Sequence, residues 1–261
     1  AYEVPYRKPG SPLYIELHTR LFPPGFSVAD SEFNDFFGTP HQHKHKTIQA
    51  LPGGRGQTLH PNDHMTYLLF HAYKHFLHSG FGIRQICDIL LFAQHHQGEI
   101  DWDQVLRSCR GIRAEKFAAA MFRMGERYLV FDPVQACFPE SWRSIQVDEM
   151  PMLEDLLDSG VFGSTDKNRQ HSSNMTLSAV EAQKNGRQGK GVWKSLFPPA
   201  KTLEGRYPYL EKYPVLLPVA WGSRVLTYGR ETLRSGSDAG ESVRIGSKRI
   251  ELLKTYGIID R

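Results

Sequence analysis

A run of helical periodicity that begins at Pro61 constrains the fold of this 261-residue chain most. Pro61 suits the first turn of a helix, and Asn62 and Asp63 suit the positive end of the helix dipole. We expect this helix to run to about Ser79, where nearby glycines break it. The next stretch, 83–96, is apolar nearly all round and predicts a buried central helix. Further helices are predicted over 101–110, 113–129, 140–145 and 149–158.

Extended segments precede these helices. Residues 11–19 alternate as in a strand, and the apolar set, Leu13, Ile15 and Leu17, predicts a face buried against helices. Glu16 and His18 then belong to the opposite face. A second extended piece near 46–51 ends at the glycines of 53–56, and a short helix is predicted over 29–37. The chain therefore predicts an α+β fold, predominantly α-helical, in which the edge of an α/β unit precedes a helical domain.

The composition changes again after residue 162. Residues 163–192 contain few apolar side chains, which is typical of a flexible loop or linker, with a short helix near 177–184. Aromatic and proline-rich packing follows, and then helices at about 215–234 and 240–256. We predict four parts: the end of an α/β unit over 1–56, a helical domain over 57–162, the linker over 163–192 and a C-terminal helical segment over 193–261.

Charge and cysteine content exclude several classes of protein. The net charge of +4 is too small and dispersed for the basic footprint of a nucleic-acid-binding protein. Three cysteines, far apart and in no CxxC pair, indicate neither a disulfide framework nor a thiolate zinc site, which favours the reducing cytoplasm. No apolar run approaches the roughly 20 residues that span a bilayer, so we expect no membrane partner. The chain opens at Ala1 without an initiator Met, and we expect it to be part of a longer protein.

Two sets of polar residues are candidates for chemistry. Glu16 beside His18 suits a divalent ion, because carboxylates on strands hold the metals of phosphoryl transfer; the alternative is an exposed glutamate on a half-buried strand. The helix over 61–79 carries histidines on one face, namely His64, His71, His75 and His78. Histidine suits proton transfer, phosphate contact or metal binding, although the zinc pattern HExxH is missing. The alternative is a set of hydrogen-bonded histidines in a helix packing seam.

Arg84 and Asp88 stand four residues apart on the otherwise apolar helix over 83–96. Because we expect this helix to be buried, the two charges must pair or line a polar cavity, since isolated buried charges are costly. An intrahelical ion pair is one account. In the other, Arg84 and Asp88 converge with His71 and His75 across the short turn, on a cavity that opens toward Glu16.

Several stretches, in this order, resemble a known family. They are YIELHTRLF, LHPNDHMTYLLFHAYKH, GIRQICDILLF, DWDQVL, GRYPYLEKYPVLLPVAW and ESVRIGSKRIELLKTYGII. Together they resemble the uncharacterised bacterial nucleotidyltransferase family of the polymerase-beta-like superfamily, with the weakest likeness across 146–190. This resemblance implies a small mixed sheet with a DxD pair of metal-binding acids and a later third carboxylate on a strand. Glu16 of IELH matches the third carboxylate.

The resemblance also implies a function. A complete member would transfer a nucleoside monophosphate from a nucleoside triphosphate to an acceptor, and paired Mg²⁺ ions would stabilise the attacking and leaving oxygens. Glu16 would be the catalytic carboxylate and a metal ligand. The substrate side of the cleft would be shaped by His18, His71, His75, Arg84 and Asp88, with Arg84 as the phosphate partner. The first two acids would lie upstream of Ala1, so we expect this chain alone to be inactive.

A second class of function stays open. The chain could be a noncatalytic helical protein-interaction module, in which the histidines and the Arg84–Asp88 pair are structural. A partner chain would then dock on the aromatic C-terminal segment.

Overall fold

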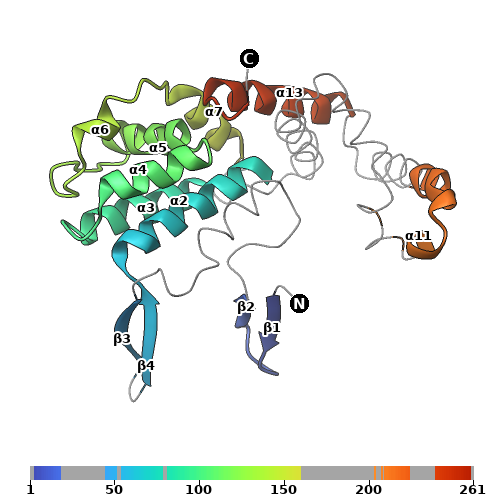
Figure 1. Ribbon diagram of the computed structural model, residues 1–261, viewed down its shortest axis with the longest axis horizontal. Coiled ribbons are helices and arrows are strands. Elements are labelled where there is room, and N and C mark those ends of the chain that lie inside the picture. The colour runs from blue at the N-terminus through green and yellow to red at the C-terminus, as the bar shows by residue number, and fades with distance from the viewer. Residues whose placement is uncertain are drawn as a thin grey trace. The chain divides into compact units, whose positions relative to one another are not determined.

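The computed structural model describes residues 3–18, 45–51, 54–78, 81–159, 203, 207, 209–223 and 239–259. The chain forms two compact units, Ala1–His71 with Asp88–Ile145 and Ala72–Cys87 with Gln146–Arg261. Helices α2 (Pro61–His78) and α3 (Ile83–His95) each contribute residues to both units (Figure 1). The four-part division predicted from the sequence stays a prediction.

The strands that the structure describes form two antiparallel hairpins. β1 (Glu3–Arg7) pairs with β2 (Tyr14–His18), and β3 (His45–Leu51) pairs with β4 (Gly54–Leu59), in two separate sheets. β2 and β3 confirm the two predicted extended segments. β1 and β4 were not predicted, because Pro5, Gly54 and Gly56 all weaken a strand when it is considered alone. In each hairpin the ladder to the neighbouring strand stabilises the weaker one.

The apolar face expected for residues 11–19 is present but not buried. Ile15 is 61% exposed and Leu17 is 53% exposed, so the prediction that this face packs against helices is wrong. Alternation along a strand fixes which residues share a face. It does not fix what covers that face.

Aromatic rings form the core of the first unit, around α4 (Trp102–Gly111), α5 (Glu115–Tyr128) and α6 (Glu140–Arg143). All pairs among Trp102, Phe122, Phe138 and Trp142 have ring centroids 4.5 to 6.0 Å apart. Both buried indole N–H groups donate to carbonyls, from Trp102 to Ala136 and from Trp142 to Trp102. Figure 1 shows α4 and α5 side by side in this unit.

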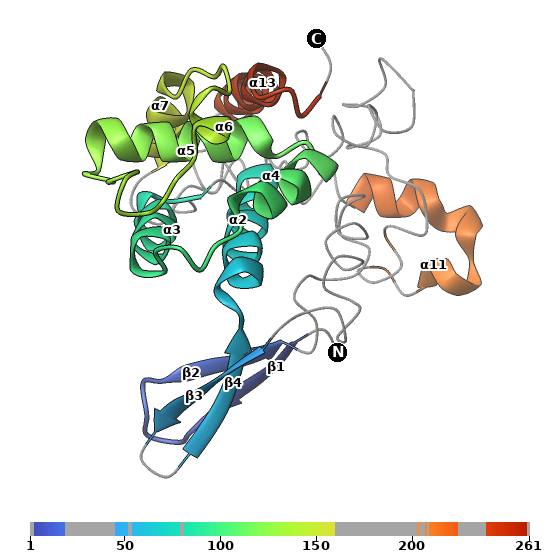
Figure 2. The same ribbon diagram turned by 60° about the vertical axis from the view of Figure 1, so that its left-hand side comes forward.

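A buried charged contact joins two helices of the second unit. There α7 (Met150–Ser159) lies beside α13 (Ala239–Thr255), as Figures 1 and 2 both show. Arg249 of α13 lies 3.8 Å from the carboxylate of Asp155 on α7, and both side chains are buried. Arg249 also donates to the carbonyl of Phe76, near the end of α2. The Tyr256 hydroxyl donates to the carbonyl of Asp148 at 3.1 Å.

Further along the chain, α11 (Tyr209–Lys212), a 3₁₀ helix (Pro214–Leu216) and a helical stretch over 217–223 share a small core of their own. Leu203, Leu210 and Ala220 are buried in it. None of the described helices combines the length and the hydrophobicity that a bilayer span requires.

The predicted helices over 61–158 and 240–256 are confirmed within two residues at most ends, and the fold is predominantly helical as expected. One prediction about them is wrong, because α3 is not buried all round. Arg84, Asp88, Leu91 and His95 are exposed and recur at helical spacing, so they form one exposed face. The predicted helices over 29–37 and 177–184, and the linker over 163–192, lie outside the described residues, as does the end of the one predicted over 215–234.

Candidate functional site

The register of the β1–β2 hairpin gathers polar positions on one face of its sheet. Glu3 lies opposite His18, Pro5 opposite Glu16, and Arg7 opposite Tyr14. Residues that face each other across an antiparallel ladder belong to the same face, and so do alternate residues of one strand. Positions 3, 7, 16 and 18 therefore share one face, which we call the polar face.

The Arg7–Tyr14 pair supports this assignment. The Arg7 guanidinium lies over the Tyr14 ring, 5.0 Å from its centroid, as cross-strand neighbours on one face should. The other face carries Tyr6, Ile15 and Leu17, all of them exposed. The hairpin is therefore two-sided, with ionisable residues on one side and apolar residues on the other.

The predicted histidine stripe lies on α2. His64, His71 and His75 are half-buried, and His78 is the last residue of the helix. The His71 ring stacks on Tyr67 with centroids 5.6 Å apart, and the His64 ring lies 4.6 Å from that of Phe92. These contacts are those of a packing seam. They leave part of each imidazole accessible.

Burial lowers the pKa of two of these histidines, His64 and His75. Burial, and then the charge of His96, lower the pKa of His64. Burial, and then the charge of Lys74, lower the pKa of His75. Burial also raises the pKa of Tyr67. A neutral imidazole can donate one hydrogen bond and accept another, which suits substrate positioning better than permanent charge does.

Arg84 and Asp88 are both exposed on α3. The expectation that they are buried is therefore wrong, because they fall on the exposed face of this helix and not among its apolar residues. An exposed guanidinium avoids the desolvation cost and stays available to an anion. The convergence of Arg84, Asp88, His71 and His75 on one cavity stays a prediction.

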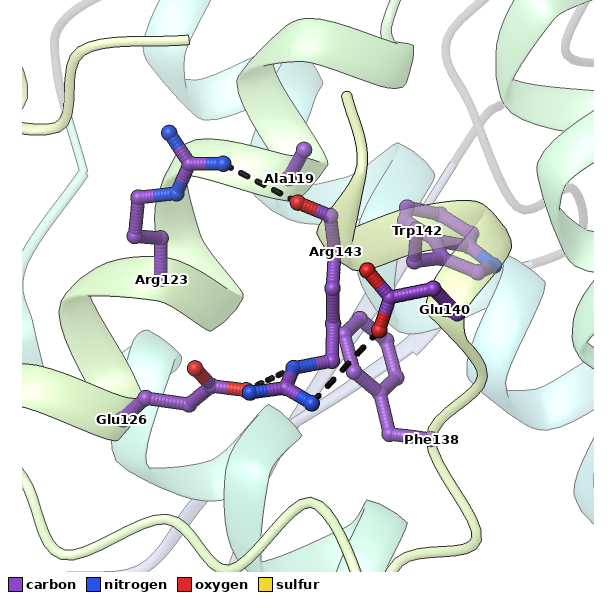
Figure 3. Close-up of a pocket in the computed structure, with 7 residues that line it drawn as sticks. All are labelled: Ala119, Arg123, Glu126, Phe138, Glu140, Trp142 and Arg143. Atoms are coloured by element: carbon purple, nitrogen blue, oxygen red, sulfur yellow. Dashed lines mark hydrogen bonds and ion pairs between the residues drawn. The ribbon is translucent and has the colours of Figure 1, made fainter. Parts of the chain in front are cut away.

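A pocket of about 210 Å³ lies beside α5 and α6 (Figure 3). Its lining residues are Ala119, Arg123, Glu126, Phe138, Glu140, Trp142 and Arg143. Arg143 lies between two carboxylates, 3.2 Å from Glu126 and 3.6 Å from Glu140. Arg123 donates to the carbonyls of Arg143 and Ile145 at 3.1 and 3.0 Å. Two guanidinium groups and two carboxylates line this pocket, so their charges cancel and leave no net charge that would attract a charged ligand. Their contacts hold α6 in place.

Within the described side chains, no group of three His, Cys, Asp or Glu is placed to hold a metal ion. The chemistry of the polar face nevertheless fits a hard cation, since carboxylate oxygens are the protein ligands that Mg²⁺ prefers. Positions 3 and 16 supply two carboxylates on that face.

Residues 1–129 match the model of a family described as uncharacterised nucleotidyltransferase. This match confirms the resemblance to an uncharacterised nucleotidyltransferase family over the stretch that contains β1–β2 and helices α2 to α5, while the superfamily placement stays a prediction. No curated protein and no solved structure matches the chain.

All the predicted site residues lie inside the matched stretch. Glu16 and His18 share a strand and a face, and His71 and His75 share a helix face. Sequence reasoning missed Glu3 and Arg7. The alternation in EVPYR indicates a strand, but Pro5 argues against one, so no strand was predicted there. Without the hairpin register, neither residue could be assigned to the face of Glu16.

Proposed function

We propose that this protein takes part in Mg²⁺-dependent nucleotidyl transfer, in which a nucleoside monophosphate passes from a nucleoside triphosphate to an acceptor. The observation that carries the proposal is the family match over residues 1–129, with the polar face inside it. Attack of an acceptor oxygen on the α-phosphorus forms the new P–O bond, and pyrophosphate leaves. The acceptor's proton passes to a base near the polar face.

The chain's own residues have distinct roles in this proposal. Glu16 and Glu3 would hold the metal through carboxylate oxygens, and Mg²⁺ supplies charge neutralisation on the phosphates when bound. Arg7 and His18 on the same face would contact phosphate oxygens. More acidic ligands are needed for two ions, and we propose that they come from residues beyond those described.

We assign the predicted helix residues to the substrate side. His71 and His75 would position the nucleotide or acceptor through their imidazole nitrogens, and exposed Arg84 would pair with a phosphate, with Asp88 orienting it. This assignment is supported by their accessibility and by the family match.

Metal-dependent nucleotide binding tests the proposal. The full chain is titrated with each of the four nucleoside triphosphates, with and without Mg²⁺, and Mn²⁺ binding is followed by EPR. Glu16→Gln should abolish metal-dependent binding with little change in Tm, and Glu3→Gln should weaken it. The matched control is Ile15→Gln, on the same strand but the other face, which should leave binding intact. Equal binding by wild type and Glu16→Gln would overturn the role of Glu16.

One observation favours the alternative, a noncatalytic interaction module. The segment over 209–223 buries a small core yet exposes Tyr213, Val215 and Val219, of which Val215 is 82% exposed. Exposed apolar residues grouped in this way are typical of a docking surface. Absence of any Mg²⁺-dependent nucleotide binding by the full chain would favour this module over the enzyme.

A further inference from the structure

A type II turn closes the β1–β2 hairpin beside the Arg7–Tyr14 pair. Its central residues are a proline and Gly10, and the Ser11 N–H donates to the Lys8 carbonyl at 3.0 Å. Gly10 has φ +77°, the left-handed conformation that the third residue of a type II turn requires. The turn therefore fixes Tyr14 opposite Arg7 at the end of the ladder.

An aromatic ring holds the Arg7 guanidinium. The guanidinium carbon lies 5.0 Å from the centroid of the Tyr14 ring, and among the described residues Arg7 forms no ion pair. Both side chains are exposed. A contact with the face of a ring needs no oxygen acceptor, so the N–H donors of the guanidinium stay available to another group. The ring also restricts a long side chain that would otherwise sample many rotamers in solvent.

The register of the hairpin places this guanidinium next to the proposed metal ligand. Arg7 lies opposite Tyr14, and Glu16 follows Tyr14 by two residues, so positions 7 and 16 are diagonal neighbours on the polar face. Diagonal neighbours across an antiparallel ladder are about 7–8 Å apart. A cation at this separation from a metal-binding carboxylate suits a chain of phosphates. One phosphate can bind the metal while the next accepts hydrogen bonds from the guanidinium.

We propose that Tyr14 is a positioning residue for the phosphate chain of a nucleoside triphosphate. Its ring holds the Arg7 guanidinium on the polar face, and the guanidinium binds the phosphate next to the one on the metal. The effect of Tyr14 on the substrate passes through Arg7. This inference rests on the proposed nucleotidyl transfer and gives Tyr14 a role within it.

Inorganic tripolyphosphate tests this role without a choice of base. Its binding to the full chain with Mg²⁺ is measured by isothermal titration calorimetry. Tyr14→Leu should weaken binding about two- to fivefold, because the energy of an exposed cation–π contact then no longer orders Arg7. Tyr14→Phe keeps the ring and should bind as wild type does. Arg7→Gln should weaken binding about tenfold or more, because it removes hydrogen bonds to a charged group.

A double variant separates positioning from direct contact. If Tyr14 acts only through Arg7, then Tyr14→Leu should cause no further loss in a chain that already carries Arg7→Gln. A full additional loss in that background overturns the proposal. So does a Tyr14→Leu variant that binds tripolyphosphate as tightly as wild type.

Tyr6→Leu is the matched control. Tyr6 is 54% exposed and lies opposite Ile15, on the other face of the same hairpin. The same substitution there should leave tripolyphosphate binding unchanged. An equal loss in Tyr6→Leu and Tyr14→Leu would mean that the stability of the hairpin governs binding, and it would overturn the proposal.

Mn²⁺ binding, followed by EPR, separates this inference from the proposed function. Tyr14→Leu should keep the Mn²⁺ affinity of wild type, because it leaves the carboxylates of the polar face unchanged. A wild-type chain that binds neither Mn²⁺ nor tripolyphosphate with Mg²⁺ overturns the proposed function and this inference with it. A wild-type chain that binds both, with no loss in Tyr14→Leu, overturns this inference alone.

Discussion

Different interactions stabilise the cores of the two units. In the first, four aromatic rings meet, and each buried indole N–H donates to a carbonyl. In the second, a buried arginine lies beside a buried aspartate and donates to the end of α2. An aromatic contact tolerates small shifts, because dispersion and area burial are hardly directional. A buried charge depends on the presence of each neighbour.

In the first unit, stability therefore depends on the volume and shape of buried side chains. In the second, it depends on the pairing of buried charges. The aromatic core should respond to lost volume. The charged contact should respond to lost charge at constant volume. Substitutions that change only one of these properties can therefore tell the two cores apart.

The largest effect is expected in the aromatic core. Trp142→Ala should lower the free energy of unfolding by about 3–5 kcal/mol, because it removes a fully buried ring and leaves a cavity. Trp142→Phe should cost less, since it keeps a ring but leaves the Trp102 carbonyl without its indole donor. Urea denaturation followed by circular dichroism measures both. As a control, Ile15→Ala on the exposed hairpin should stay within about 0.5 kcal/mol.

The charged contact should respond to a nearly isosteric change. Asp155→Asn keeps the volume but removes the carboxylate beside Arg249, and we expect a loss of about 3 kcal/mol. The double variant Asp155→Leu with Arg249→Met should cost less than Asp155→Asn, because no charge is then left buried. Urea denaturation again reports the change.

The same pair of helices offers the matched control. Lys248 and Asp158 also join α13 to α7, at 2.7 Å, but both side chains are largely exposed. Lys248→Ala should therefore cost no more than about 1 kcal/mol. Equal losses for Lys248→Ala and Asp155→Asn would show that burial does not govern the strength of these contacts.

A smaller effect is expected where α3 approaches α5. A Cβ on Gly125 would lie 2.7 and 2.8 Å from the two Cδ atoms of Leu90 and 3.2 Å from the Phe131 Cβ. Gly125→Ala should thus cost about 1–3 kcal/mol by overpacking. Gly111→Ala, where nothing lies within 4 Å, should be neutral or slightly stabilising. A gain in Tm for Gly125→Ala would contradict this close approach.

What the sequence predicted, and what it did not, follows from the range of the interactions. The bounds of α2 and α13 were predictable because helical period and end residues are local. The contact of Arg249 with Phe76 joins residues 173 apart and has no local pattern. Arg84 and Asp88 were expected to be buried because their helix is rich in apolar residues, yet Leu91 beside them is also exposed. The polar face needed the register of a hairpin whose first strand contains a proline.

The smallest effect concerns pH, at the seam between α2 and α3. The His64 ring lies 4.6 Å from the Phe92 ring and 6.3 Å from the Tyr67 ring. The His96 ring lies 4.3 Å from the Phe92 ring, and His96 also contacts Glu99. Burial and the charge of His96 lower the pKa of His64 below the ordinary value of 6.5. The unfolded chain therefore takes up the proton first as the pH falls. This contribution to stability is present above pH 6.5 and is lost as the pH falls from there toward the folded pKa.

His64→Gln tests that sign. In wild type, Tm should fall between about pH 7.5 and pH 5.5, and His64→Gln should make that fall shallower because glutamine does not titrate. The control is Gln97→Ala, which changes an exposed residue that does not titrate and should leave the slope as in wild type. A steeper fall in His64→Gln would mean that protonated His64 stabilises the folded seam between α2 and α3. The stability of that seam would then depend on charge, as that of the Arg249–Asp155 contact does, and not on packing, as that of the aromatic core does.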